Sequence, residues 1–87
     1  MVIIVPEPKR IANLAKHAID LADFEAGFSW DHYMVLPAKP SRTGRVREMF
    51  IGTMHGRTVA AIVSPLGTEA LAVISIRPAD DRERAVL

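Results

Sequence analysis

The strongest structural signal in the chain comes from residues 46–77, VREMFIGTMHGRTVAAIVSPLGTEALAVISIR. It contains three apolar runs that are rich in β-branched residues: 46–54, 57–64 and 69–77. His55-Gly56 separates the first two runs and Pro65-Leu66-Gly67 the last two, and such segments favour tight turns. The pattern predicts three consecutive antiparallel strands. Because the middle run is apolar on both faces, we expect it at the centre of the sheet or covered on both sides.

The residues on either side of this stretch predict elements that can cover the sheet. We expect a strand at 2–5, a helix from Pro8 to about His17, a helix that begins after Asp20, a strand at 32–36 and a loop at 37–45. Asp20 is a suitable N-terminal cap for the second helix, which should extend through Phe28 but is weakened by Gly27. In the tail, Asp80 and Glu83 have the spacing of a capping box, so a short terminal helix begins there.

The composition is that of one compact domain, which we place at residues 1–87. Hydrophobic residues make up 49% of the chain and charged residues 24%, a globular balance. No apolar run approaches the roughly 20 residues that span a bilayer, and the N-terminus lacks the order of a secretory signal, so we expect a cytoplasmic protein without a membrane partner. The absence of cysteine excludes a thiol nucleophile and a thiolate metal site. The expected fold class is α+β, with an antiparallel sheet, two N-terminal helices and a short C-terminal helix.

Arginines at strand ends are the first candidates for a functional site. The net charge is only +1, but eight of the eleven basic residues are arginine, whose planar guanidinium can bind phosphate through two parallel hydrogen bonds. Arg47, Arg57 and Arg77 each lie next to a predicted turn and can converge on one rim of the sheet. Strand-end arginines are equally common as solvated residues that protect a sheet edge from aggregation, so both interpretations stay open for each.

The faces of the last predicted strand decide which arginines can act together. Simple alternation places Ser75 and Arg77 on the same face as Leu71 and Val73, so the polar character lies at one end of an apolar face. Whether Arg57 shares that face depends on the hairpin register around the turn, which the sequence leaves open.

Proton transfer has two candidates. In the first predicted helix, Asn13, Lys16 and His17 form a polar face opposite an apolar stripe, and we expect this polar face to be solvated or occupied by a ligand. His17 can transfer a proton near neutral pH, although a histidine at a helix end also commonly caps the last carbonyl groups. Glu48 is either a base or, more simply, the ion-pair partner of an arginine.

The remaining candidate groups have simpler interpretations. His32 and His55 are expected to be surface residues of a strand or turn, and the histidines are too far apart in sequence to predict a metal site. No phosphate-binding glycine loop or dinucleotide motif is present, so no cofactor is expected. Phe28, Trp30 and Tyr33 are interpreted as core residues in preference to a platform for stacking bases.

The order of three segments resembles a known family. PKRIANLAKHAIDLADFEAGF at 8–28, VREMFIGTMHGRTVAAIV at 46–63 and VISIRPADDRER at 73–84 are similar to the BrnT family, the ribonuclease toxins of bacterial type II toxin-antitoxin pairs. The chain departs from the family pattern at three places: Val5-Pro6 replaces a tryptophan-aspartate pair, Ala18 replaces the glycine after the Lys-His pair, and Leu87 replaces a terminal aromatic residue.

The resemblance implies a RelE-like α+β fold and cleavage of RNA without a metal. It also implies neutralisation by a BrnA-like antitoxin with a ribbon-helix-helix part, through which alone the complex contacts operator DNA. Metal-independent cleavage needs proton transfer and stabilisation of the charge on the phosphorane. The residues that suit these roles are Arg57 and Arg77 at the scissile phosphate, His17 or Glu48 for proton transfer, and Lys16, Arg47 and Arg84 for binding the RNA backbone.

Two other functions remain as alternatives to RNA cleavage. The same basic edge can belong to a binding module that holds a protein or nucleic acid without chemistry, in which case binding is sensitive to salt and no cleavage follows. The arginines can also serve only to keep a structural subunit soluble.

Overall fold

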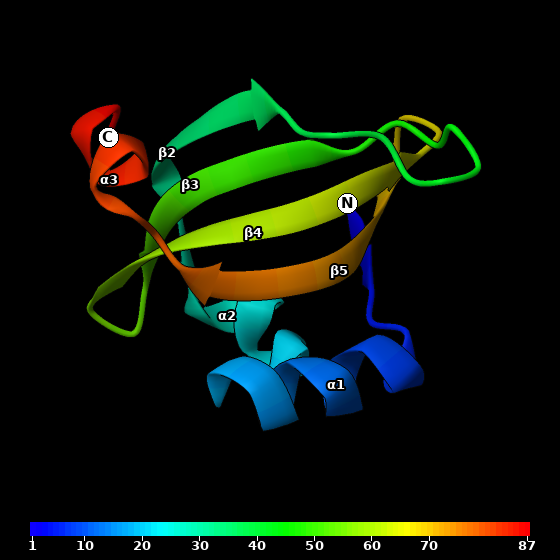
Figure 1. Ribbon diagram of the computed structural model, residues 1–87, viewed down its shortest axis with the longest axis horizontal. Helices are drawn as coiled ribbons and strands as arrows, with labels where there is room; N and C mark the ends of the chain where they lie inside the picture. Colours follow the sequence, from blue (N-terminus) through cyan, green and yellow to red (C-terminus); the bar gives the residue numbers. More distant parts are fainter.

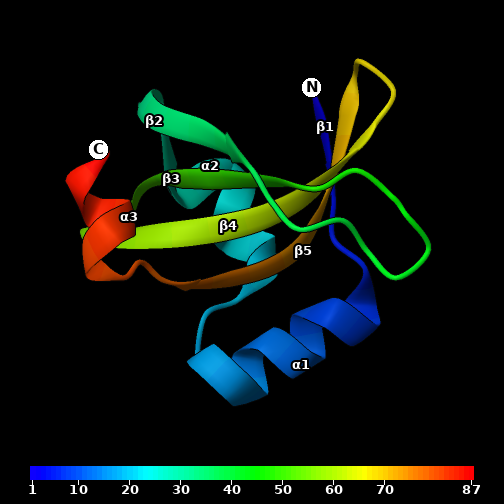
Figure 2. The same cartoon turned by 45° about the horizontal axis from the view of Figure 1, so that its top comes forward.

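The computed structural model describes residues 1–87, and its centre is a five-stranded sheet with the strand order β1-β5-β4-β3-β2 (Figure 1). The elements in chain order are β1 (Val2–Ile4), α1 (Glu7–His17), the 3-10 helix η1 (Leu21–Asp23), α2 (Phe24–Gly27), β2 (Phe28–Pro37), β3 (Glu48–Met54), β4 (Arg57–Leu66), β5 (Ala70–Pro78) and α3 (Asp81–Ala85). Helices α1 and α2 lie on one side of the sheet, and α3 lies at the other side (Figures 1 and 2).

The three predicted consecutive strands are confirmed as the antiparallel β3-β4-β5 unit, with β4 at the centre of the sheet. His55 and Gly56 form the first turn, both with positive φ, 51° and 75°, which is the conformation that matches the twist of a tight hairpin. The second turn was predicted to begin two residues too early. Pro65 and Leu66 belong to β4, where they pair with Leu71 and Ala70. Proline is tolerated there because the pairing of β3 with β4 ends at Val63, so no neighbour on that side needs an amide.

The first strand makes the sheet mixed, which corrects the prediction of an antiparallel sheet. β1 pairs in parallel with β5, with Ile3 opposite Leu71. It forms one edge and β2 forms the other, so the chain crosses the whole sheet between its first two strands, with α1, η1 and α2 in the connection (Figure 2). Sequence periodicity identifies a strand but not its partner, because pairing is a tertiary contact.

The second helix is shorter than predicted. Asp20 caps it as expected, since its side chain accepts a hydrogen bond from the amide of Ala22 at 2.9 Å, but the helix is a 3-10 turn followed by one α-helical turn. Phe28 begins β2 and is not part of the helix, and β2 is twice the predicted length. The ring of Phe28 lies against Gly52, where an added Cβ would come within 2.5 Å of it. Burial of this ring over β3 therefore outweighs the helical spacing of the sequence.

The core lies between the sheet and the helices on one side of it. It consists of Ile19, Leu21, Phe24, Phe28, Phe50, Met54, Val59, Ala61, Val63, Leu71, Val73 and Ile76. The predicted aromatic core is confirmed in part: the Phe28 ring is buried and Trp30 is half-buried, whereas Tyr33 is 36% exposed at the margin and stacks on Phe50.

The orientation of α1 differs from the expectation for an amphipathic helix. The helix turns Asn13 toward β5, where this residue is 5% exposed, and leaves Ile11 58% and Leu14 38% exposed. The Asn13 amide donates to the carbonyl oxygens of Ile19 at 2.9 Å and Ile76 at 3.0 Å, and its oxygen accepts from the amide of Ile76 at 3.0 Å. Because β1 covers only the first part of β5, Asn13 satisfies backbone groups that would otherwise be buried without a partner.

Candidate functional site

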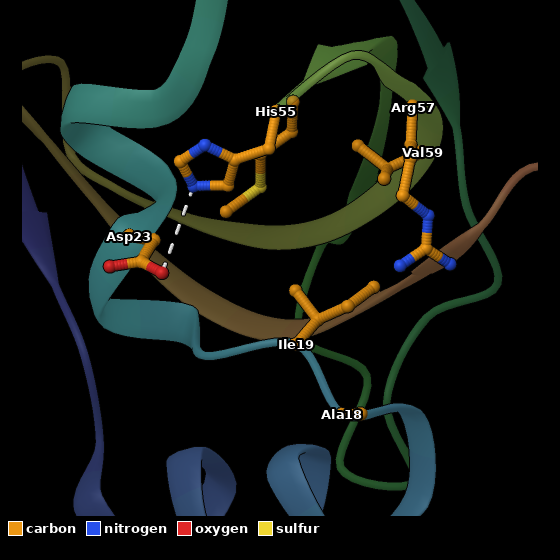
Figure 3. A pocket seen from close by; sticks show the side chains of 7 residues that line it. Ala18, Ile19, Asp23, His55, Arg57 and Val59 are labelled. Carbon is orange, nitrogen blue, oxygen red and sulfur yellow. Dashed lines mark ion pairs between the residues drawn. The ribbon is translucent and has the colours of Figure 1, made fainter.

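A cleft at the β3-β4 turn contains Arg57, which is exposed, whereas Arg47 and Arg77 are half-buried. Arg57 is the first residue of β4 and lies on the same face as the buried Val59, which points toward the helices. A cavity of about 100 Å³ opens beside it, and we call this the hairpin cleft. Its lining residues are Ala18, Ile19, Asp23, Met54, His55, Arg57 and Val59. The Arg57 guanidinium and the His55 imidazole stand on opposite sides of the cleft (Figure 3).

A histidine-aspartate pair forms one wall of the hairpin cleft. The Nε2 atom of His55 lies 3.7 Å from Oδ2 of Asp23, the last residue of η1, and both side chains are more than half exposed (Figure 3). The imidazole packs over Gly27, where an added Cβ would come within 2.9 Å of Nε2. The His55 imidazole therefore lies between the Asp23 carboxylate and the α2 backbone.

Sequence reasoning missed this pair, because His55 was expected to be only a surface residue of a turn. One signal was present in the sequence: His55 occupies the position before Gly56 in a tight turn where asparagine, aspartate or glycine is usual, because that position takes a positive φ, here 51°. A histidine in such a place is held at some backbone cost, and residues of this kind often belong to functional sites.

The end of α1 forms the floor of the cleft. Ala18 is the C-terminal cap of the helix in the left-handed conformation, φ 58°, and its amide donates to the carbonyl oxygen of Leu14. The predicted candidates Lys16 and His17 are in the last turn, directly before this cap; Lys16 is exposed and His17 is half-buried. Asn13, in contrast, is buried in a structural role, so the prediction of one continuous solvated polar face is wrong.

Arg77 lies near the same end of the sheet as Arg57 but on the opposite face. It pairs with Ala60, three residues from Arg57. The prediction that Arg77 shares a face of the sheet with Leu71 and Val73 is wrong, because β5 contains a bulge. Ile62 pairs with Ser75 and Val63 with Val73, so β5 has one extra residue here and the side chains after it point to the other face.

The guanidinium of Arg77 is bound within the chain. It forms two parallel hydrogen bonds with Glu83 of α3, at 2.7 and 2.6 Å, and the Glu83 side chain is only 11% exposed. These bonds raise the pKa of Arg77 and lower the pKa of Glu83. The predicted capping box is confirmed, since Glu83 also accepts from the amide of Asp80 and Asp80 from that of Glu83. Arg84 pairs with Asp81 and donates to the carbonyl oxygen of Ala79.

Arg47 and Glu48 lie at the other end of β3 from the hairpin cleft. Glu48 pairs with Val63, whereas Met54, six residues further on, pairs with Arg57. The proposed convergence of Arg47, Arg57 and Arg77 on one rim is therefore wrong. Glu48 forms no ion pair, and the Nε atom of Arg47 is buried without a hydrogen-bond partner.

Two further observations concern ligands and membranes. No three His, Cys, Asp or Glu side chains come together as a set of metal ligands. None of the helices has the length and apolar character required to cross a membrane. A second hollow, of about 340 Å³, lies between the two edge strands and is lined by Met1, Ile3, Glu25, Trp30 and Tyr33, without a basic residue.

The chain is a small α+β protein whose hairpin cleft has an arginine on the side opposite a histidine-aspartate pair. The model of the family described as "Ribonuclease toxin, BrnT, of type II toxin-antitoxin system" matches residues 6–83. The chain therefore belongs to the BrnT family of ribonuclease toxins.

A solved structure of the same family is similar over nearly the whole chain. The 1.1 Å crystal structure of the Brucella abortus ribonuclease toxin BrnT is 43% identical, with a TM-score of 0.73, and the match covers 93% of this chain and 99% of that one. No curated protein matches the chain. The structural match agrees with the α+β architecture described above.

Proposed function

We propose that this chain is a metal-independent endoribonuclease with a RelE-like fold, and that the hairpin cleft is where RNA is cut. The observation that carries the proposal is the position of Arg57 across one cleft from the His55-Asp23 pair, in a member of a ribonuclease toxin family. A guanidinium and an imidazole supply the two functions that cleavage by the RNA's own 2′-hydroxyl requires.

In the proposed reaction one proton leaves the attacking 2′-hydroxyl and another is added to the leaving 5′-oxygen. Neutral His55 accepts the proton of the 2′-hydroxyl, the 2′-oxygen bonds to phosphorus, and the bond from phosphorus to the 5′-oxygen breaks. The leaving oxygen takes a proton from water or from a second acid, for which the candidate is His17, the residue before the cleft-lining Ala18. Arg57 donates hydrogen bonds to the non-bridging oxygens as negative charge develops there. The products are a 2′,3′-cyclic phosphate and a free 5′-hydroxyl.

The other candidate residues receive roles that their positions allow. Lys16, in the exposed last turn of α1, is proposed to bind the RNA backbone next to the cleft. Arg47, Arg77 and Arg84 lie away from it, so we assign them to backbone phosphates beyond the scissile one; Arg77 and Arg84 then exchange their partners Glu83 and Asp81 for RNA. Glu48 lies too far along β3 to act at Arg57, so proton transfer is assigned to the histidines.

The test is RNA cleavage by purified protein in the presence of a chelator. Arg57→Ala and His55→Gln are each expected to lower the rate at least about 100-fold. Arg42→Ala, in the exposed loop before β3, is the matched control and should cleave like the wild type. Intact RNA with folded wild type at high concentration would refute cleavage, and salt-sensitive binding without cleavage would support the non-catalytic binding module instead.

Chemical rescue separates His55 from a residue that only binds RNA. Because the imidazole is proposed to accept the proton of the 2′-hydroxyl, added imidazole should restore part of the cleavage rate that is lost in His55→Gln. An RNA-binding variant that imidazole does not rescue would exclude His55 as the base.

We also propose that a BrnA-like antitoxin neutralises the chain and that operator DNA is bound only through its ribbon-helix-helix part. Membership of a type II toxin-antitoxin family supports a protein antitoxin. The complex should shift operator DNA in a gel, whereas the toxin alone should not. A shift by the toxin alone would contradict the division of roles.

A further inference from the structure

One edge of the sheet has no strand beside it. β2 is the last strand in the sheet order and pairs only with β3. The amide of Ala38, the residue after β2, donates to the carbonyl oxygen of Arg47, and the bonds of an antiparallel pair alternate along a strand, so the even-numbered residues of β2 near Ala38 bond to β3. The backbone N–H and C=O groups of Tyr33 and Val35 therefore point away from the sheet. We call residues 33–37 the open edge.

The open edge presents apolar side chains together with its backbone groups. Tyr33 is 36%, Met34 41% and Val35 42% exposed, and no charged residue lies among them. Pro37, at the end of the open edge, lacks an N–H but still offers a carbonyl oxygen. An exposed edge of this kind can take up a further strand, whose backbone supplies the matching donors and acceptors. An extended polypeptide fits these groups, whereas an RNA backbone has no alternating N–H and C=O groups.

The chain directly after the open edge forms a basic arm, which we define as residues 38–47. The arm is a closed hairpin, because the amide of Ser41 donates to the carbonyl oxygen of Arg45 at 3.1 Å, and it projects from the sheet in both views (Figures 1 and 2). Four of the eleven basic residues of the chain lie in the arm, and no acidic residue does. The exposed ones, none of which forms an ion pair, are Lys39, Arg42 and Arg45.

We propose that the open edge and the basic arm together bind an acidic, extended segment of the antitoxin. Membership of a type II toxin-antitoxin family provides the protein partner, and the inference rests on the proposed neutralisation of this toxin. The segment pairs with the outward backbone groups of Tyr33 and Val35, and its acidic side chains meet the exposed charges of the arm. The open edge thus selects a polypeptide, and the basic arm selects the sign of its charge.

This surface lies away from the hairpin cleft. Val35 pairs with Phe50 and Pro37 with Glu48, whereas Met54, at the other end of β3, lines the cleft. RNA in the cleft and a strand on the open edge therefore contact different residues. The proposed contact anchors the antitoxin, and blocking of the cleft is left to another part of it.

Paired substitutions at Val35 test the strand contact. The probe is the purified protein encoded by the reading frame next to that of this chain, titrated by calorimetry. Val35→Pro removes an N–H that points to the partner and leaves the hydrogen bonds to β3 in place, so binding should weaken at least about tenfold. Val35→Thr keeps the N–H and the branched shape, and it should bind like the wild type.

Charge reversal gives an independent test that leaves the strand untouched and decides the matter if Val35→Pro does not fold. Arg42→Glu should weaken antitoxin binding at least about fivefold and reduce its dependence on salt. Arg82→Glu is the matched control, because it changes the net charge equally at an exposed residue of α3 that has no ion pair. This control should bind like the wild type, and both variants should cleave RNA like the wild type when alone.

Binding and cleavage are separate readouts. If the wild type binds the antitoxin but cleaves no RNA, the proposed catalysis fails, while loss of binding in Arg42→Glu but not in Arg82→Glu still supports the surface. The proposal is overturned by wild-type affinity in Arg42→Glu, by equal losses in Arg42→Glu and Arg82→Glu, or by a wild type that does not bind the probe.

Two further results would overturn the proposal by assigning the surface to another occupant. Weaker binding of RNA by Arg42→Glu, with unchanged binding of the antitoxin, would assign the basic arm to RNA. A wild-type dimer, seen by sedimentation, that Val35→Pro dissociates while antitoxin binding is unchanged would assign the open edge to a second copy of this chain.

Discussion

Replacing Glu83 by glutamine is expected to destabilise the protein through a single contact. Glutamine keeps the size of the side chain and can still accept the hydrogen bond from the Asp80 amide, so the capping box survives. The substitution removes the negative charge of the carboxylate, whose two oxygens accept hydrogen bonds from the Arg77 guanidinium at 2.7 and 2.6 Å. Charge-assisted, two-pronged pairs are the strong ones, and the Glu83 side chain is only 11% exposed. Because Arg77 is 33% exposed and partly hydrated, we expect a loss of about 2 kcal/mol in the free energy of unfolding.

Urea denaturation at neutral pH measures this loss. For a domain of this size, about 2 kcal/mol corresponds to a fall of roughly 10 °C in the melting temperature. Asp81→Asn is the matched control, because it removes the exposed ion pair with Arg84 on the same helix and should cost less than about 0.5 kcal/mol. Equal losses of stability in the two variants, or a loss below about 0.5 kcal/mol for Glu83→Gln, would refute the conclusion that the pair of Arg77 and Glu83 holds α3 against β5.

The pH dependence of this difference has a definite sign. The pKa of Glu83 is lowered in the folded protein by Arg77, so the folded state binds the proton less readily than the unfolded chain does. The stabilisation is therefore complete above the unfolded pKa of glutamate, about 4.3, and is lost as the pH falls through the lower folded value. The difference between wild type and Glu83→Gln should shrink toward zero in acid. A difference that grows in acid would contradict the pairing.

Three further substitutions test the fold. Ala18→Gly should stabilise the protein by about 1 kcal/mol, seen as a higher urea midpoint, because the φ of 58° at this helix cap suits glycine better than alanine. Asn13→Leu should cost about 3 kcal/mol or more in the same assay, because it leaves buried backbone groups of Ile76 and Ile19 without partners. Gly52→Ala should cost about 1–3 kcal/mol and change the near-UV circular dichroism, because its Cβ would lie 2.5 Å from the Phe28 ring.

The β3-β4-β5 unit was predictable because its signals are local. Apolar runs and turn residues determine strand type within a few positions of the chain, and the capping box at Asp80 and Glu83 is local in the same way. The bulge in β5 is not local: it places Ile76 in the core and sends Ser75 and Arg77 to the other face. One inserted residue was enough to separate Arg57 from Arg77, which sequence alternation could not reveal.

The candidate site was predicted in part. Arg57 lies in a cleft, as a phosphate ligand must, but its neighbours His55 and Asp23 are 32 residues apart and meet only through the packing of the β3-β4 turn on α2. Arg77 and Glu83 are only six residues apart, yet their pairing was not predictable from local signals. The capping-box spacing places Glu83 at the start of α3, but its contact with Arg77 depends on how α3 folds back toward β5.

The orientation of α1 shows why an amphipathic pattern does not by itself determine the buried face. A stripe of one leucine, one isoleucine and two alanines offers little apolar area, whereas the uncovered edge of β5 exposes amide and carbonyl groups that cost more if buried unpaired. Asn13 satisfies those groups, so the helix turns its polar side inward. The apolar side chains of α1 consequently stay on its solvent side, where Ile11 is 58% and Leu14 38% exposed. The burial of a single amide side chain that pairs the edge of β5 therefore outweighs the burial of this small apolar stripe.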